Sequence, residues 1–126
     1  ALIEAEVARG VPVERILLAG FSQGGAIVLS AALRRRWPVA GLIALSTYLP
    51  DIEAAIAAPG SEGPLPPIFM AHGQKDPVIP QDVAVHSAKA LKELGFPLEW
   101  HSYFMAHQVC AEEIQALGDW LDARFR

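Results

Sequence analysis

A serine flanked by glycines follows a short apolar run near the start of the sequence. The pentapeptide Gly-Phe-Ser-Gln-Gly at 20–24 comes directly after the apolar residues 16–19 and opens an apolar stretch. A G-x-S-x-G pentapeptide at a strand-to-helix junction is typical of a sharp turn that presents the serine oxygen as a nucleophile. Because flanking side chains would collide with the neighbouring strand and helix, we expect glycine to be required at Gly20 and Gly24. Ser22 alone is a weak nucleophile, so this chemistry needs a base and an orienting acid elsewhere.

An aspartate and a histidine occupy the loops after later predicted strands. Asp76 follows the third apolar run and His107 follows the fourth. Since functional sites in parallel α/β sheets form at the carboxyl ends of the strands, we expect Ser22, Asp76 and His107 to meet there. Their order along the chain is that of the α/β-hydrolase triad. In this interpretation His107 accepts the Ser22 proton, while Asp76 fixes the tautomer of the imidazole.

Other acids and histidines compete for these roles. Asp82 lies in the first turn of a predicted helix and Asp51 precedes a short one, so both are better placed to cap a helix. His86 falls within a helix and His101 within a strand, which predicts surface or packing roles for both. His72 abuts the third strand, and we expect it to organise the following loop through hydrogen bonds with the backbone.

Stabilising the oxyanion requires two N–H donors. The backbone N–H of Gln23, at the start of a helix, is the predicted first donor. The second normally comes from a loop after an earlier strand, for which this sequence has no counterpart. Apolar residues in the strand-end loops either line an acyl pocket or pack the loops, and both interpretations stay open. These residues are Leu49, Val78, Ile79 and Met105.

The elements that must position these residues alternate between strands and helices. Apolar patterning predicts strands over Val13–Ala19, Val39–Leu45, Ile68–Ala71 and Leu98–Phe104. It predicts helices over 2–9, Gln23–Arg36, 51–57, Gln81–Leu94 and Glu112–Phe125. This alternation predicts an α/β fold whose parallel four-stranded βαβαβαβα sheet is covered by helices on both faces.

Two of the helices carry specific predictions about burial. The first turns of Gln23–Arg36 are apolar nearly all round, which predicts that this end is deeply buried. The closing helix, Glu112–Phe125, is amphipathic. Its predicted buried face consists of Ile114, Leu117, Trp120, Leu121 and Phe125.

Composition narrows the classes of partner. The chain has 126 residues, 52% of them hydrophobic, and a formal charge of -4, which fits one compact domain and argues against nucleic acid or anionic membranes as partners. The single cysteine, Cys110, allows no internal disulfide, and we expect neither a metal nor a cofactor. No apolar run approaches the roughly 18 residues of a membrane span. The opening residues have the pattern of the middle of a helix rather than of a signal peptide, so we expect a chain that begins partway through a gene product. We also expect the protein to be cytoplasmic.

Four segments resemble the phospholipase/carboxylesterase family, which comprises bacterial carboxylesterases and acyl-protein thioesterases. They are residues 20–26, 44–48, 72–80 and 105–107. The resemblance runs from about Val13 to the end of the chain. It implies an α/β-hydrolase fold and a metal-independent esterase with Ser22, Asp76 and His107 as its triad. One departure is that relatives commonly carry Gly-Met-Gly-His before the base, where this chain has Phe-Met-Ala-His at 104–107.

The resemblance also implies that an N-terminal half of the domain is missing. Relatives are considerably longer, and their N-terminal half carries a Leu-His-Gly loop that supplies the second oxyanion donor. Residues 1–126 would then be the C-terminal part of a single α/β-hydrolase domain. The strand Val13–Ala19 would be left as a long, apolar, unpaired edge, which is an aggregation or dimerisation hazard. We therefore expect the missing half or a dimer partner to cover that edge.

The predicted function is hydrolysis of carboxylic esters or thioesters, with a small-molecule ester or an acylated molecule as substrate. Two alternatives stay open. The same triad can transfer the acyl group to another acceptor, because the sequence does not distinguish water from a different nucleophile. A chain of this kind can also be a noncatalytic binding module or an inactive fragment.

Overall fold

The computed structural model describes residues 8–10, 15–35, 39–50 and 65–124. The predicted helix over 51–57, the alternative acid Asp51 and most of the predicted helix over 2–9 lie outside the described residues. The described elements are β1 (Leu17–Phe21), α2 (Gln23–Arg35), β2 (Gly41–Leu45), β3 (Ile68–Gly73), α4 (Gln81–Glu93), β4 (Leu98–Tyr103) and α5 (Ala111–Arg124).

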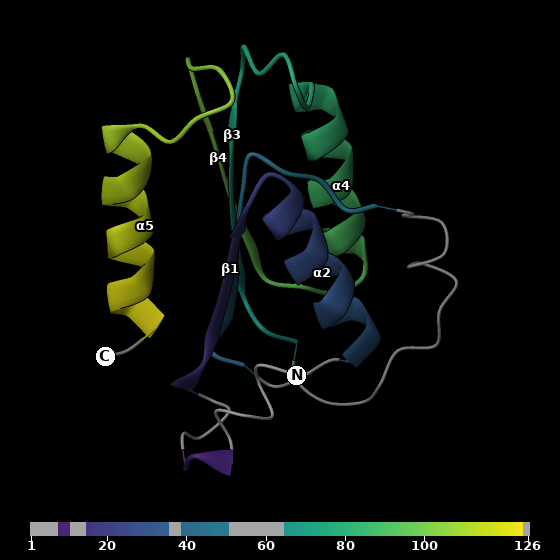
Figure 1. The fold of residues 1–126 in the computed structure, drawn as a ribbon, viewed down its shortest axis with the longest axis vertical. Helices are drawn as coiled ribbons and strands as arrows, with labels where there is room; N and C mark the ends of the chain where they lie inside the picture. The colour runs from purple at the N-terminus through teal and green to yellow at the C-terminus, as the bar shows by residue number, and fades with distance from the viewer. Residues whose placement is uncertain (1–7, 11–14, 36–38, 51–64, 125–126) are drawn as a thin grey trace.

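The strands form one four-stranded sheet in the order β1-β2-β3-β4, and every neighbouring pair is parallel. Helices α2 and α4 lie on one face of the sheet and α5 lies on the other (Figure 1). Parallel neighbours cannot be joined by a tight hairpin, so each connection must cross a face of the sheet. The predicted parallel α/β sheet with helices on both faces is confirmed.

Alternation along the central strands builds a core on each face of the sheet. Leu42 and Ala44 of β2 belong to the core beneath α2 and α4, together with Ile68 and Met70 of β3. The intervening side chains form the core beneath α5. Its buried members are Ile43, Phe69, Ala71 and Trp120. Strand β2 is therefore apolar along its whole length, and β3 is apolar as far as Ala71, because both faces of each strand are covered.

Two strands extend further toward their carboxyl ends than predicted. Strand β1 (Leu17–Phe21) ends two residues after the predicted end at Ala19, because Gly20 and Phe21 stay in register with β2. Residues 13 and 14 of the predicted strand lie outside the described residues. Strand β3 continues to Gly73 rather than ending at Ala71, since its last two residues pair with β4. The connections from β1 to α2 and from β3 to α4 are therefore shorter than predicted.

The predicted buried face of α5 is wrong at its first position. Ile114 is 60% exposed, whereas the adjacent Glu113 is fully buried. Glu113 shares a helical face with Trp120, seven positions later, which packs against Phe69 and Gly41 of the sheet. A hydrophobicity pattern predicts that Ile114 faces the sheet. The packing of Trp120 instead turns the helix so that Glu113 faces the sheet and Ile114 faces outward.

Burial of Glu113 has a consequence for stability that can be measured. Neither carboxylate oxygen meets hydrogen-bond geometry with a described residue. Burial raises the pKa of Glu113 above 4.5, and the nearby Cys110 backbone and His101 offset this only in part. The folded protein thus holds a proton on Glu113 more tightly than the unfolded chain does. This group therefore destabilises the fold progressively as pH rises through the interval above its unfolded pKa.

We expect Glu113→Gln to raise the midpoint of thermal unfolding at pH 8, because the amide fills the same volume without ionising. The gain should disappear near pH 4, where wild-type Glu113 is protonated in both states. Thermal unfolding across this pH range measures the difference, with the exposed Glu112→Gln as the matched control. A gain that is equal at both pH values would contradict this explanation.

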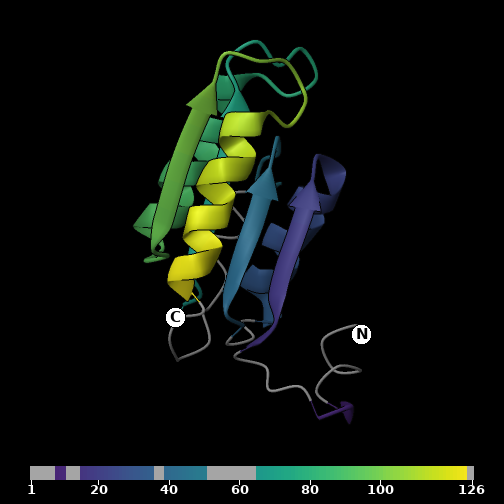
Figure 2. The same cartoon turned by 90° about the vertical axis from the view of Figure 1, so that its left-hand side faces the viewer.

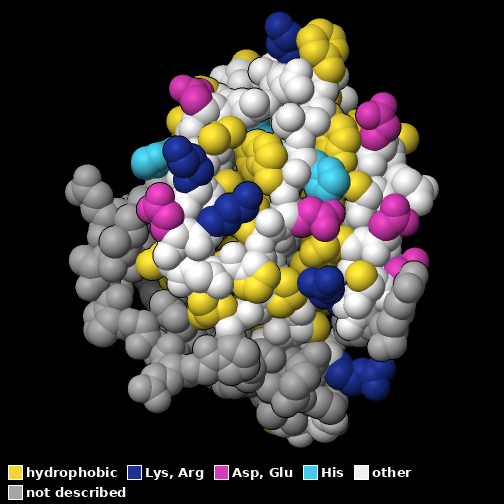
Figure 3. Space-filling view, turned by 180° about the vertical axis from the view of Figure 1, so that it is seen from behind, with side chains coloured by type: hydrophobic (Ala, Val, Ile, Leu, Met, Phe, Trp, Pro, Cys, Tyr) yellow, Lys and Arg dark blue, Asp and Glu magenta, His cyan; other side chains and the backbone are white. Residues whose placement is uncertain are grey.

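The surface carries mixed charges. On the face shown in Figure 3, Lys and Arg side chains are spread among acidic and hydrophobic ones rather than gathered in one basic patch. No helix among the described residues is long and apolar enough to cross a membrane.

The predicted deep burial of the start of α2 is only partly correct, since Ala26 and Leu29 are buried but Ile27 is 68% exposed.

Candidate active site

The side chains predicted to form a triad lie in three loops at the carboxyl edge of the sheet. Ser22 directly follows β1, Asp76 lies in the loop after β3, and His107 lies in the loop after β4. In Figure 2 the arrows of the four sheet strands point to this end of the molecule, and the loops after β3 and β4 arch over it. The topology therefore brings together residues that are far apart in the sequence.

Ser22, His107 and Asp76 are joined by two short hydrogen bonds. His107 Nε2 lies 2.8 Å from Ser22 Oγ, and His107 Nδ1 lies 2.6 Å from Asp76 Oδ2. With an ionised Asp76, Nδ1–H donates to the carboxylate and Nε2 is left to accept the serine hydroxyl. This tautomer leaves His107 free to take the serine proton.

Asp76 is almost completely buried, yet its surroundings favour the ionised form. Its Oδ1 accepts hydrogen bonds from the backbone N–H groups of Val78 and Ile79, at 2.8 and 2.9 Å. Burial alone would raise the pKa of Asp76, but the donors at Ile79, His107 and Val78 outweigh it and hold this pKa below 3.8. The carboxylate is thus a fixed negative charge behind His107 at neutral pH.

The turn at Ser22 is strained and is crowded on one side. Ser22 has φ of 58°, a left-handed conformation that is costly for a residue with a side chain. A Cβ atom at Gly20 would lie 2.3 Å from the backbone of Gly24, so glycine is required there. The predicted requirement for glycine at Gly24 is wrong: a Cβ there would meet nothing within 4 Å among the described residues outside its own helix, because this position faces away from the strand. The second crowded position is Gly25, whose Cβ would lie 2.5 Å from the side chain of Thr47.

His72 organises the acid loop, as predicted. It is fully buried, and its Nε2–H donates to the carbonyl oxygen of Ile79 at 2.7 Å. The same nitrogen lies 3.4 Å from Asp76 Oδ2. His72 therefore holds the segment whose N–H groups bind Asp76, and its polar contacts among the described residues are with the acid loop rather than with Ser22.

The acid and base loops are also held together through their backbones. Gln74 N–H donates to the Tyr103 carbonyl and Lys75 N–H donates to the Met105 carbonyl, at 2.8 and 2.9 Å. A Cβ at Gly73 would lie 2.2 Å from the carbonyl oxygen of Ala106, so only glycine lets the base loop approach this closely. No single-sequence pattern marks Gly73 for this role, because the contact joins two distant loops.

The competing residues lie elsewhere. His86 is exposed on α4, and Asp82 is exposed in the first turn of the same helix. His101 lies on β4, where its Nε2 is 2.7 Å from Glu99 Oε2. The structure thus brings Asp76 and His107, rather than these three residues, together with Ser22.

Gln23 and the predicted acyl-contact residues occupy different environments. Gln23 is the first residue of α2, so its N–H lies among the helix-end donors that lack an intrahelical partner. Leu49 and Met105 are buried, and Leu49 belongs to the core beneath α2 and α4. Val78, by contrast, is 63% exposed. Of the three, Val78 is the one with surface available for contact.

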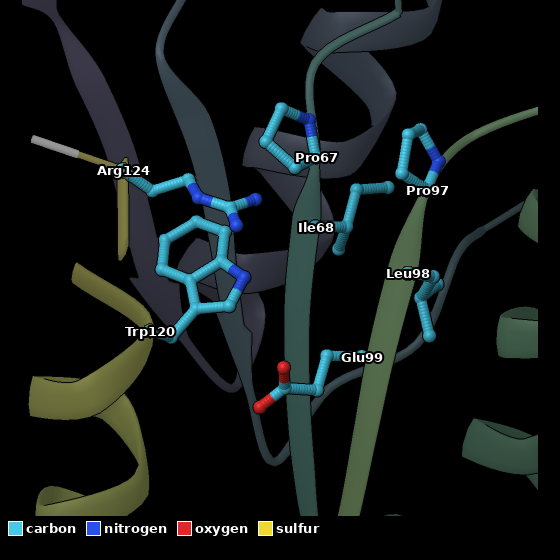
Figure 4. A pocket seen from close by; sticks show the side chains of 7 residues that line it. All are labelled: Pro67, Ile68, Pro97, Leu98, Glu99, Trp120 and Arg124. Atoms are coloured by element: carbon cyan, nitrogen blue, oxygen red, sulfur yellow. The ribbon is translucent and has the colours of Figure 1, made fainter. Parts of the chain in front are cut away.

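A pocket of about 210 Å³ lies at the opposite end of the sheet. Its lining, seen in Figure 4, includes Ile68 and Leu98, which begin β3 and β4. The guanidinium of Arg124 lies 5.2 Å from the ring centroid of Trp120 at its rim. This pocket is therefore separate from the loops that carry Ser22, Asp76 and His107. The described residues contain no group of three or more His, Cys, Asp or Glu side chains that could hold a metal ion.

Comparison with known proteins gives a consistent result. The model of the phospholipase/carboxylesterase family matches residues 1–124. The chain belongs to this family. Acyl-protein thioesterase 1 of Neurospora crassa is 40% identical over 126 residues, which cover 98% of this chain and 51% of that protein. Acyl-protein thioesterase 1 of Mycosarcoma maydis is 42% identical over 120 residues, which cover 89% of this chain and 49% of that protein.

The α/β-hydrolase fold expected for the phospholipase/carboxylesterase family is also found among solved structures. The crystal structure of Arabidopsis thaliana SOBER1 superposes with a TM-score of 0.88 at 27% identity, covering 99% of this chain and 60% of that one. The chain spans about half the length of the curated relatives it matches.

Proposed function

We propose that the protein carrying this chain is a serine hydrolase that cleaves carboxylic esters or thioesters through an acyl-enzyme. The observation that carries this proposal is the continuous relay Ser22–His107–Asp76, with hydrogen bonds of 2.8 and 2.6 Å. Membership of the phospholipase/carboxylesterase family supports the reaction class.

The reaction follows from the positions of these groups. His107 Nε2 takes the proton from Ser22 Oγ as that oxygen attacks the carbonyl carbon. The negative charge that develops on the carbonyl oxygen is stabilised by the backbone N–H of Gln23 at the helix N-terminus. His107 then gives its proton to the leaving alcohol or thiol, and Asp76 stabilises the imidazolium between these steps. Water, activated by the same histidine, releases the acid from Ser22.

A second oxyanion donor has to come from outside the described residues in this proposal. We propose that residues 1–126 form the C-terminal part of one α/β-hydrolase domain and that an N-terminal half, or a dimer partner, covers the free edge of β1. Two observations favour a cover there. First, strand β1 pairs only with β2 among the described strands. Second, two large apolar side chains near this edge are exposed: Phe21, the last residue of β1, by 42%, and Ile27 of α2 by 68%.

The substrate that we propose is an acylated molecule, either a small ester or a thioester, and the place of action is the cytoplasm. The curated relatives are named acyl-protein thioesterases, which favours the thioester. Val78 is the candidate for contact with the acyl chain, because Leu49 and Met105 are buried. Hydrolysis of p-nitrophenyl esters of increasing chain length, beside an acyl thioester, would rank these substrates.

A fluorophosphonate probe tests the proposed chemistry directly. We expect it to label the protein carrying this chain at Ser22 and to lose that label completely in Ser22→Ala. Mass spectrometry of the labelled peptide measures this, and Ser30→Ala on α2 is the matched control that should label like wild type. A protein that is folded but unlabelled at Ser22 would refute the proposed function.

A further inference from the structure

The relay has to span the whole width of the described sheet. Ser22 follows β1 and His107 follows β4, and these strands lie at opposite edges with β2 and β3 between them. Three inter-strand spacings amount to about 14 Å. An imidazole cannot bridge that distance, so the loop after β4 must carry His107 back across the ends of β3 and β2.

This loop is held at the ends of both strands that it crosses. At the end of β3 it passes over Gly73, where there is no room for a Cβ atom below the Ala106 carbonyl. At the end of β2 its Gln108 carbonyl lies 3.3 Å from Ser46 Oγ, whose hydroxyl donates to it. His107 therefore lies between two held residues of the loop, Ala106 above Gly73 and Gln108 beside Ser46.

The next residue, Thr47, is bonded to the nucleophile itself. Its Oγ1–H donates to the Ser22 carbonyl at 2.6 Å, and that carbonyl also accepts the Ala26 N–H at 3.2 Å. The Thr47 side chain fills the space that a Cβ at Gly25 would occupy. Thr47 thus holds the strained Ser22 turn through its backbone carbonyl, the same carbonyl that accepts the Ala26 N–H at the start of α2.

Both residues carry signs of a constrained position. Ser46 and Thr47 are fully buried, and Ser46 has φ of 52°. A left-handed conformation is unfavourable for a serine and persists only where its surroundings hold it. The Ser46 N–H donates to the Ala71 carbonyl at 2.9 Å, which ties this turn to the neighbouring strand.

We propose that Ser46 and Thr47 are positioning residues, which set the distance between Ser22 Oγ and His107 Nε2 by holding the nucleophile turn and the base loop on one rigid dipeptide. This inference rests on the proposed serine hydrolase function. Neither residue touches the substrate in it; each acts through the backbone of a neighbouring loop.

Thr47→Val tests the proposal, because valine keeps the shape of threonine and removes its hydroxyl. We expect kcat for a p-nitrophenyl ester to fall about 10- to 100-fold with KM nearly unchanged, since small displacements of reacting groups cost this much. The rate of fluorophosphonate labelling at Ser22 should fall by a similar factor. Thr47→Ser, which restores the hydroxyl, should recover most of both rates.

Ser46→Ala provides the second variant, which removes the hydroxyl bonded to the Gln108 carbonyl. We expect a smaller loss of kcat, again with little change in KM, because that hydrogen bond is longer. If the folded variants keep wild-type kcat, or if Thr47→Ser is as slow as Thr47→Val, the positioning role is wrong. Absence of labelling at Ser22 in the wild type would instead refute the proposed function, so the two failures are distinguishable.

Discussion

Asp76→Asn is expected to lower kcat for ester hydrolysis about 10,000-fold, the loss typical of a triad that keeps its geometry but holds the wrong histidine tautomer. The buried carboxylate receives two backbone N–H groups on one oxygen and His107 Nδ1–H on the other. An amide at position 76 has a single acceptor oxygen, which can serve either the backbone N–H groups or His107 Nδ1–H, but not both. Its NH2 group then faces either the backbone donors or His107, and in the second case His107 loses the acceptor for its Nδ1 proton.

Steady-state kinetics on p-nitrophenyl esters measure this loss, and Asp82→Asn is the matched control. Asp82 is an exposed carboxylate nearby in the chain, so its substitution should leave kcat unchanged. The mutation should also alter acid stability. Because the pKa of Asp76 is lowered on folding, its contribution is present above 3.8 and is lost as pH falls through the folded value. A variant with wild-type kcat would show that Asp76 does not support the base.

Gly20→Ala is expected to destabilise the protein by about 3 kcal/mol, the upper range for overpacking a tight site. The added methyl would lie 2.3 Å from the backbone of Gly24. The three nearest atoms are all backbone atoms of Gly24 and Gly25, so no flexible side chain can move away and the strand and the helix would have to separate at Ser22. We expect this variant to lose fluorophosphonate labelling as well as stability.

Gly24→Ala is the matched control, since it changes the other glycine of the same pentapeptide. Its Cβ meets no described atom within 4 Å, and alanine favours the helix by up to about 1 kcal/mol over glycine. Urea denaturation of both variants gives the comparison. Equal destabilisation of the two would mean that the crowding at Gly20 does not decide the stability of this turn.

Much of the fold was predictable because the relevant signals are local. Apolar runs separated by amphipathic segments indicate a parallel α/β sheet, and this holds for β2 and β3 because both of their faces are buried. The placement of Ser22, Asp76 and His107 at one edge also follows from the sequence, since each comes directly after a strand or in the loop behind it. A rule about where sites form in such sheets is enough to expect their contact.

The contacts that refine the site were not predictable from one sequence. The roles of Thr47 beside Gly25, and of Gly73 below Ala106, arise between segments that are distant along the chain. The buried Glu113 was missed because a carboxylate is rarely fully buried, so periodicity favours its apolar neighbour Ile114. In each case the deciding quantity is a distance between elements, which no residue pattern contains.

The path of the base loop across the sheet has a consequence for how the protein folds. The hydrogen bond from Ser22 to His107 joins residues 85 positions apart, and it requires all the intervening strands to be paired in order. Contacts of such high sequence separation form late, because the entropy of closing the chain must first be overcome. Reactivity of Ser22 should therefore appear only after helices and local packing have formed. If Ser22 is the nucleophile that we propose, the rate at which its labelling appears during refolding is expected to follow a late step of folding.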